Sequence, residues 1–384
     1  MNYSNNKILI WAPYRGNVGT IDAVINYANM FSDGGYHPIF VEVCDEWSSI
    51  QNINENYEII SLTQSRILKN IGKTNLLKRR DFFLYCFFKL FKLKQVIFEI
   101  NPKFIFGFLG LAQLLIASKD SNYPVFGSIQ GYPRFLNSKI KKNFYIKTED
   151  NIRKFVWKKT YSRLQSICCM TPSTAEKISH FLGKPATFVP NPLFAGIPET
   201  TQIFSAEKPV DYVLIGRFCY QKRFDAGLSF FRKVKLLQPR SKLHIFGDVT
   251  SKDIQSLNIL TDSEVDEAII LHGFRKDLWS YMNTNLNAVH LVASQWEDPG
   301  HAILEGLNHK VPTLFINVEA NYMDFYNGYK VCVFNYMNNI SFDEINDLIR
   351  VASEPKGTRR IQKNLCSKFY KSNVYKIVDS LIDV

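Results

Sequence analysis

The stretch NAVHLVASQWEDPGHAILEGL, residues 287 to 307, contains the pattern that decides the fold of this chain. Its first seven residues are nearly all apolar, which is typical of a strand buried in a parallel sheet. Pro299 and Gly300 then break the chain, and a helix is expected to begin near His301. The loop between strand and helix would lie at the carboxyl end of the strand, where such sheets bind ligands.

The same alternation of apolar runs and helical stretches extends through the rest of the chain. In the first half the expected strands are 7–11, 38–43, 104–108, 124–129, 166–170 and 186–190. In the second half they are 211–216, 242–247, 268–273, 287–293, 312–316 and 330–334. Between the halves, residues 190–209 carry four prolines and no clear period, which indicates a domain boundary. The pattern predicts an α/β protein of two Rossmann-like, doubly wound domains that face each other across a cleft.

Composition excludes several classes of protein. The 384 residues suit two domains, and 46% hydrophobic with 21% charged residues excludes a mostly disordered chain. A net charge of +12 attracts polyanions, which include nucleic acid, nucleotide phosphates and anionic membrane surfaces. The seven cysteines form no Cys-x-x-Cys pair and indicate buried thiols in a reducing compartment. No signal-peptide pattern and no apolar run of about 18 residues occurs, so we expect a cytoplasmic protein.

Two cations follow the first expected strand of the second half. In GRFCYQK, residues 216–222, Gly216 makes the turn and Arg217 and Lys222 project from the loop. Cations at the carboxyl end of a strand suit a diphosphate, whose negative charge must be neutralised when it leaves. The alternative interpretation is a basic loop that faces solvent.

Two carboxylates surround the start of the helix after residue 300. The first N–H groups of a helix have no partner within it and favour a phosphate. Glu297, in the loop before the helix, can accept hydrogen bonds from sugar hydroxyls, and Glu305 can accept them from a ribose. The alternative is an exposed loop and helix with two surface carboxylates. A weaker signal is LHGF, residues 271–274, which closes another strand and places Phe274 at its end.

The first half has two candidate loops. Arg15, Gly16 and Gly19 lie between the first strand and the first helix, where glycines allow close approach of a ligand, although a plain tight turn explains them nearly as well. Gln130 and Gly131 end another strand. The seven histidines show no metal-ligand spacing and no Asp-x-Asp triplet occurs, so neither a metal nor any other cofactor is implied.

Taken together, the chain resembles the family-4 glycosyltransferases of the GT-B fold. The resemblance rests on Gly216-Arg217 followed by Lys222, on the spacing Glu297-x7-Glu305, on LHGF, and on the runs 101–134 and 171–193. It implies an N-terminal acceptor-binding domain at 1–195, a C-terminal nucleotide-sugar-binding domain at 207–365, and a helix at 366–384 that packs back on the first domain. It also implies transfer with retention of anomeric configuration.

The resemblance assigns roles to particular residues. Arg217 and Lys222 would bind the diphosphate, and together with Glu297 they are the expected catalytic residues. Glu297 would hold the donor sugar and Glu305 the ribose. The remaining donor-binding residues would be Gly16, Gly19, Phe274, Gly300, His301, Ala302 and Ile303. Gln130 and Arg15 are expected on the acceptor side.

Two positions depart from the family's pattern. The common Glu-Gly-Phe-Gly is here Glu297-Asp298-Pro299-Gly300, which narrows the loop and adds a charge near the donor sugar. Where many members have His-Gly, this chain has Gln130-Gly131, so the role of that histidine does not transfer.

The leading hypothesis is therefore a retaining hexosyltransferase that uses a nucleotide sugar, with UDP expected, and a glycan acceptor. Residues 66–94, with nine basic side chains and one acid, include a Phe-rich amphipathic pattern that suits the inner, anionic surface of a cell membrane. That pattern points to a lipid-linked acceptor in bacterial surface-polysaccharide assembly, such as lipopolysaccharide. The alternative is an aromatic helix packed on its own sheet.

Two other classes of protein remain as alternatives. One is a non-catalytic GT-B partner subunit or nucleotide-sugar-binding module, against which the presence of all four charged site residues argues. The other is a nucleic-acid binder, which would explain the charge of +12 but has no recognisable module here, so nucleic acid is not an expected partner.

Overall fold

The computed structural model describes two compact units, residues 1–194 with 368–384 and residues 195–367. Within them the described residues are 6–14, 20–63, 89–136, 144–192, 205, 208–259, 267–275, 277–309, 311–316, 326, 332–334, 342–353 and 371–382. None of the helices in these residues is long and apolar enough to cross a membrane.

Unit 1 is built on a seven-stranded sheet of order β3-β2-β1-β4-β5-β6-β7, with every neighbouring pair parallel. The strands are β1 (Lys7–Trp11), β2 (His37–Glu42), β3 (Glu58–Ser61), β4 (Phe104–Gly107), β5 (Val125–Ile129), β6 (Ser166–Cys169) and β7 (Ala186–Phe188). Strand β3 is absent from the sequence-based expectation. It is short, lies at the sheet edge and is only half-buried, so it lacks the apolar run by which the others are recognised.

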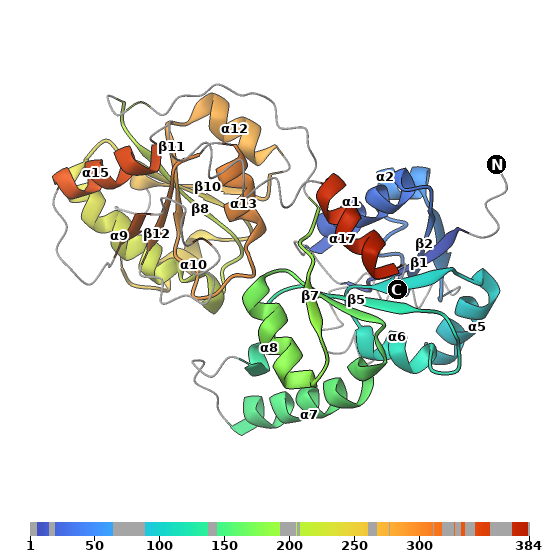
Figure 1. Ribbon diagram of the computed structural model, residues 1–384. Coiled ribbons are helices and arrows are strands. Elements are labelled where there is room, and N and C mark those ends of the chain that lie inside the picture. The colour runs from blue at the N-terminus through green and yellow to red at the C-terminus, as the bar shows by residue number, and fades with distance from the viewer. Residues whose placement is uncertain are drawn as a thin grey trace. The chain divides into compact units, whose positions relative to one another are not determined.

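Helices cover both faces of this sheet (Figure 1). On one face lie α1 (Thr20–Asp33), α2 (Gln51–Asn56) and α17 (Lys371–Ile382). On the other lie α5 (Leu90–Ile100), α6 (Leu111–Ala117), α7 (Phe144–Thr160) and α8 (Pro172–Leu182). Short 3₁₀ turns occur at Arg134–Leu136 and Tyr161–Arg163. The C-terminal helix α17 thus joins the first unit, because Val374 and Val378 are buried in the same core as α1.

Unit 2 is built on a six-stranded sheet of order β10-β9-β8-β11-β12-β13, again parallel throughout. The strands are β8 (Asp211–Ile215), β9 (Lys242–Phe246), β10 (Ile269–Gly273), β11 (Ala288–Val292), β12 (Thr313–Ile316) and β13 (Cys332–Phe334). Helices α9 (Phe224–Leu237), α10 (Ser251–Gln255) and α15 (Phe342–Ser353) pack on one face. Helices α12 (Leu278–Asn285) and α13 (His301–Asn308) lie on the other (Figure 1).

The strand order of unit 2 reverses between β8 and β11. From β8 the chain proceeds outward to β9 and β10, and it then returns to form β11 on the opposite side of β8. Loops that leave two such strands diverge to opposite faces and open a crevice at their carboxyl ends. The expected α/β fold of two doubly wound, Rossmann-like domains is therefore confirmed, and β8 and β11 mark where a ligand of unit 2 would bind.

Candidate functional site

Glycines end the strands on one side of this crevice. Gly216, Gly247 and Gly273 follow or end β8, β9 and β10 with φ of +148°, +135° and +65°. The N–H of Gly216 donates to the carbonyl of Phe246 and that of Gly247 to the carbonyl of Gly273, each at 2.8 Å. A Cβ at Gly247 would overlap the backbone of Gly216. A side chain is therefore excluded at Gly247 by the close approach of the Gly216 backbone, and the positive φ of all three residues favours glycine.

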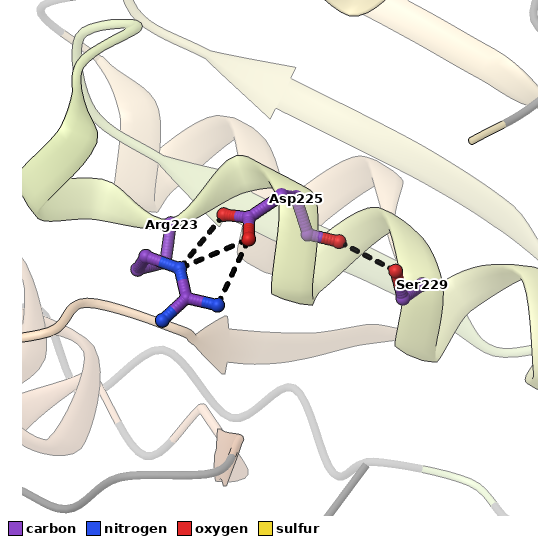
Figure 2. Close-up of polar contacts among 3 residues, drawn as sticks. All are labelled: Arg223, Asp225 and Ser229. Atoms are coloured by element: carbon purple, nitrogen blue, oxygen red, sulfur yellow. Dashed lines mark hydrogen bonds and ion pairs between the residues drawn. The ribbon is translucent and has the colours of Figure 1, made fainter. Parts of the chain in front are cut away.

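Local hydrogen bonds stabilise the β8–α9 loop. After the 3₁₀ turn Tyr220–Lys222, Arg223 adopts a left-handed conformation with φ of +47°. Figure 2 shows its guanidinium bonded to both carboxylate oxygens of Asp225, at 2.8 to 3.0 Å, and the Ser229 hydroxyl bonded to the Asp225 carbonyl. Helix α9 begins at this junction. The Lys222 side chain lies along Gly216, so a Cβ added to Gly216 would be only 2.9 Å from the Lys222 Cε.

Gln221 joins this loop to the loop after β11. Its carbonyl accepts from the Gln295 N–H at 2.7 Å, and its side-chain amide donates to the Trp296 carbonyl at 2.9 Å. Sequence reasoning overlooked Gln221, because no motif marks a residue whose role is to bridge two loops. The two bonds join the segments that carry the neighbouring residues Lys222 and Glu297.

Lys222 and Glu297 consequently form an ion pair. The Lys222 Nζ lies 2.5 Å from the Glu297 Oε1, and the two side chains are 24% and 8% exposed. An ion pair shielded from water in this way interacts much more strongly than one on the surface. The two residues are 75 positions apart in sequence and meet because β8 and β11 are adjacent.

Helix α13 begins directly beside this ion pair. Gly300 precedes the helix with φ of +91°, and no side chain caps it. A Cβ at Gly300 would lie 2.9 Å from the Ile303 side chain and 3.2 Å from that of Glu297. The buried hydroxyl of Tyr326 donates to the Pro299 carbonyl at 2.7 Å and anchors the loop. Ala302 and Ile303 line a small cavity together with Gly300, Lys222 and Glu297.

Two histidines near the ion pair, His290 and His301, are neutral at pH 7. Burial, aided by the charge of Lys222, lowers the pKa of His290 to about 3. Burial also lowers the pKa of His301 to about 4, although Glu297 opposes this shift. His290 lines the same cavity and was not singled out from the sequence. At neutral pH the formal charges beside the cavity are therefore those of Lys222 and Glu297.

The remaining donor-site candidates lie around this centre. Glu305 lies farther along α13, and its Oε2 accepts from the Trp279 indole at 2.8 Å. Trp279, a residue of α12 that the sequence did not indicate, stacks on His309 with 5.6 Å between ring centroids. Arg217 is exposed at the end of β8, and Phe274 is 67% exposed just beyond β10.

On the acceptor side, the structure describes one of the candidates. Gln130, just after β5, forms reciprocal amide hydrogen bonds with the fully buried Asn191, at 2.8 and 2.9 Å. Its amide also donates to the Ser128 hydroxyl at 2.6 Å. Arg15, Gly16 and Gly19 lie outside the described residues. Asn191 was not expected from the sequence, because its partner is 61 residues away.

Other expectations concern the membrane segment, metals and thiols. Of residues 66–94, those from 66 to 88 lie outside the described residues, and in the remainder Phe91 is 74% exposed. No group of three His, Cys, Asp or Glu in the described part of the chain is arranged to hold a metal ion. Cys44, Cys168 and Cys169 are buried thiols as expected, but Cys219 is exposed because it lies in the β8–α9 loop.

The second unit of the chain matches a known protein family. Residues 198–362 match the model of the family described as glycosyl transferases group 1. No curated protein sequence matches the chain.

Solved structures of similar fold cover almost the whole chain. The lipopolysaccharide outer core galactosyltransferase WaaB in its apo form is 16% identical, with coverage of 98% of this chain and 99% of that one and a TM-score of 0.62. Anabaena HepE in complex with UDP and glucose is 11% identical, with 99% coverage of both chains and a TM-score of 0.69. Sucrose-phosphate synthase from Thermosynechococcus elongatus is 13% identical, with coverage of 99% of this chain and 98% of that one and a TM-score of 0.70. The expected GT-B fold is thus confirmed, and unit 2 carries the group 1 match.

Proposed function

Because the chain has the GT-B fold and its second unit matches the group 1 glycosyl transferases, we propose that it is a retaining hexosyltransferase. Its donor is a nucleotide sugar, with UDP as the nucleotide, and its acceptor is a lipid-linked glycan. The observation that carries the proposal is the ion pair of Lys222 and Glu297 at the reversal of strand order, directly beside the uncapped start of α13.

The donor's diphosphate is assigned to the cationic side of the site. Lys222 supplies one positive charge and the exposed Arg217 a second, while the N–H groups at Gly300 to Ala302, where α13 begins, supply uncharged donors. The N–H of Ile303 already donates to the Gly300 carbonyl at 3.0 Å, so that residue would contact the donor through other atoms. This combination neutralises a diphosphate without a metal ion. The Lys222 side chain lies along Gly216, where the absence of a Cβ leaves room for it.

The sugar and the nucleoside are assigned to the acidic side. When Lys222 turns to the phosphate, the Glu297 carboxylate becomes an acceptor for the sugar's hydroxyl groups. Glu305, which Trp279 holds at 2.8 Å, accepts from the ribose hydroxyls, and Phe274 lies beside the base. The order of these residues along α13 and at the neighbouring strand ends supports the assignment.

The transfer step needs no protein nucleophile. The bond from the anomeric carbon to the phosphate oxygen breaks, and its electron pair leaves with the diphosphate. The acceptor hydroxyl attacks from the same face, and its proton passes to the departing phosphate oxygen, so the configuration is retained. Lys222 and the α13 N–H groups stabilise the charge that develops on the phosphate. Neutral His290 and His301 are not the proton donors at neutral pH, since their pKa values lie at about 3 and about 4.

The choice of donor and acceptor rests on the similar structures. HepE was solved with UDP and glucose, and WaaB is described as a lipopolysaccharide galactosyltransferase. By analogy we assign this chain to bacterial surface-polysaccharide assembly on the cytoplasmic side of the membrane. In unit 1, the neutral amide pair of Gln130 and Asn191 suits the hydroxyl groups of a glycan acceptor.

A panel of UDP-, GDP- and other activated sugars tests this function. We expect one UDP-sugar to raise the unfolding temperature and to be hydrolysed slowly to UDP by the full-length protein. The Lys222→Ala variant should lose both effects. Binding of a UDP-sugar without hydrolysis or transfer to any glycan would favour the non-catalytic module instead. If no activated sugar binds, the proposal fails.

A further inference from the structure

The exposed large apolar side chains of unit 1 gather on one layer of helices. Within the described residues of that unit they are Phe91, Phe98, Ile116, Phe144, Ile152 and Phe155. All six lie on α5, α6 and α7, which cover the same face of the sheet (Figure 1). Six exposed large apolar side chains on one layer of helices make that layer a candidate interaction surface.

Helix α7 carries three of the six, among them the most exposed one, Phe144. Phe144, Ile152 and Phe155 are 86%, 60% and 64% exposed. Their spacings of eight and three residues place them on one side of a helix. On the opposite side Asp150 is buried, and Trp157 stacks on the buried Tyr161 with 4.2 Å between ring centroids. The packing of α7 on unit 1 therefore leaves this apolar row outside.

A row of lysines runs beside the apolar row. Lys147, Lys154 and Lys158 recur at intervals of seven and four residues, and Lys159 lies at the end of the helix with its ammonium 6.0 Å from the Phe155 ring. The Lys158 ammonium lies 5.2 Å from the centre of the Phe181 ring on α8, so this side chain would turn outward to reach a lipid phosphate. The acids of α7 do not offset them, because Glu149 is bonded to Arg153 and Asp150 is buried. We name the residues Phe144, Lys147, Ile152, Lys154, Phe155, Lys158 and Lys159 the α7 face.

We propose that the α7 face docks unit 1 on the surface of an anionic lipid bilayer. The three apolar side chains would enter the boundary between headgroups and acyl chains, while the lysines bind lipid phosphates. A long lysine chain can reach outward from a helix that lies in the plane of the interface.

The form of the surface favours a bilayer over a protein partner. The apolar side chains stand apart on one helix, with Thr148, Asn151 and lysines between them. Interfaces between proteins place a contiguous, well-packed patch at their centre and contain few lysines there. A fluid bilayer surface accommodates separate apolar side chains and provides negative charge on every side.

This surface is distinct from the segment 66–94 and does not depend on the proposed chemistry. It consists entirely of described residues, and none of them belongs to the donor or acceptor candidates. Substitutions on the α7 face should therefore leave nucleotide-sugar binding in unit 2 unchanged.

Vesicle co-sedimentation of the full-length protein tests the proposal. We expect binding to vesicles of phosphatidylglycerol and phosphatidylcholine at about 0.1 M salt, and little binding to phosphatidylcholine alone. The pair Phe144→Ser with Phe155→Ser should weaken binding about tenfold or more. Lys147→Gln, Lys154→Gln and Lys158→Gln together should weaken it by about the same factor.

Matched controls lie on unit 2. Leu236→Ser removes an apolar side chain that is 80% exposed on α9, and Lys252→Gln removes an exposed lysine on α10. Both should bind vesicles as the wild type does, and all variants should keep its unfolding temperature. Failure of the wild type to bind anionic vesicles overturns the proposal. Undiminished binding by both α7 variants overturns it as well, and then assigns the membrane contact to another segment such as 66–94.

Discussion

Units 1 and 2 have the same kind of parallel sheet, but the side chains at their strand ends differ in charge. In unit 2, a lysine after β8 and a glutamate after β11 face each other beside a helix start. In unit 1, a neutral amide pair joins the residue after β5 to the segment after β7. The same scaffold therefore carries different side chains at its strand ends, and under the proposed function those in unit 2 would bind an anion and those in unit 1 a neutral, hydroxyl-rich molecule.

Unit 1 does have carboxylates near its strand ends, but its own loop uses them. Glu42, at the end of β2, accepts from the N–H groups of Trp47 and Ser48 at 3.1 and 2.9 Å. Glu46 accepts from those of Val43 and Cys44 at 2.8 and 2.6 Å. These acids stabilise a turn, whereas Glu297 is paired with a side chain that can move away from it.

The largest effect is expected from removing either charge of the ion pair. Lys222→Ala and Glu297→Ala should each reduce transfer about 100-fold or more, because one removes stabilisation of the leaving diphosphate and the other a contact to the sugar. Turnover with the preferred donor and a glycan acceptor is the measurement.

The control for these variants is Asp347→Ala, which breaks the exposed ion pair with Arg350 on α15. It should retain wild-type turnover. If Lys222→Ala and Glu297→Ala both transfer sugar at the wild-type rate while remaining folded, the assignment of the site to unit 2 is wrong.

Two glycines that end strands provide the next test of the contrast. Gly247→Ala should destabilise unit 2 by about 3 kcal/mol or more, because the methyl group overlaps the Gly216 backbone and φ is +135°. Gly131→Ala in unit 1, with φ of +104° and no atom within 4 Å of a Cβ, should cost only about 1 kcal/mol of strain. Urea unfolding measures both, and equal losses would contradict the crowding at β9.

One buried group in each unit should contribute to stability with the opposite dependence on pH. Burial lowers the folded-state pKa of His290 in unit 2 to about 3, below the ordinary 6.5. Its contribution to the free energy of unfolding is therefore complete above about pH 6.5 and is lost as the pH falls below that value. Burial raises the folded-state pKa of Glu46 in unit 1 to about 7, above the ordinary 4.5. Its contribution to the free energy of unfolding is therefore lost as the pH rises from about 4.5 to 7.

The variant His290→Gln, which does not titrate, isolates the first effect. Its free energy of unfolding relative to wild type should rise by about 1.4 kcal/mol for each pH unit below about 6.5. Urea midpoints at a series of pH values measure it. A constant difference between variant and wild type across this range would show that His290 is not held neutral.

A smaller effect should follow from neutralising Glu297 without shortening it. Glu297→Gln frees Lys222 from its partner, so the ammonium is available to a diphosphate without competition. We expect UDP to bind about tenfold more tightly, equivalent to about 1.4 kcal/mol, although transfer is lost. Calorimetric titration with UDP is the measurement. Weaker binding would indicate that Glu297 positions Lys222 for the phosphate rather than competing for it.

The smallest effect is expected in unit 1. Gln130→Ala leaves the Asn191 amide without its reciprocal partner, and it should raise the KM for the glycan acceptor several-fold while the KM for the donor stays constant. Steady-state kinetics with each substrate varied in turn separates the two. An increase in the KM for the donor alone would indicate that Gln130 acts on donor binding and not on acceptor binding.

The amino-acid sequence determined the fold class and most of the strands. Buried parallel strands have largely apolar runs such as DYVLI and AVHLV, and these can be recognised without a structure. The half-buried edge strand β3 escaped because EIIS is neither long nor wholly apolar. The spacing from Glu297 to Glu305 was also legible, since both residues belong to one continuous loop and helix.

Only the tertiary structure decided which of these residues meet. The contact between Lys222 and Glu297 depends on β8 lying next to β11, and the bridge through Gln221 depends on the same pairing. The order of strands in a sheet is set by the packing of whole helices and by crossovers, which no local pattern encodes. The α7 face likewise became visible only when packing showed which side of the helix Trp157 occupies.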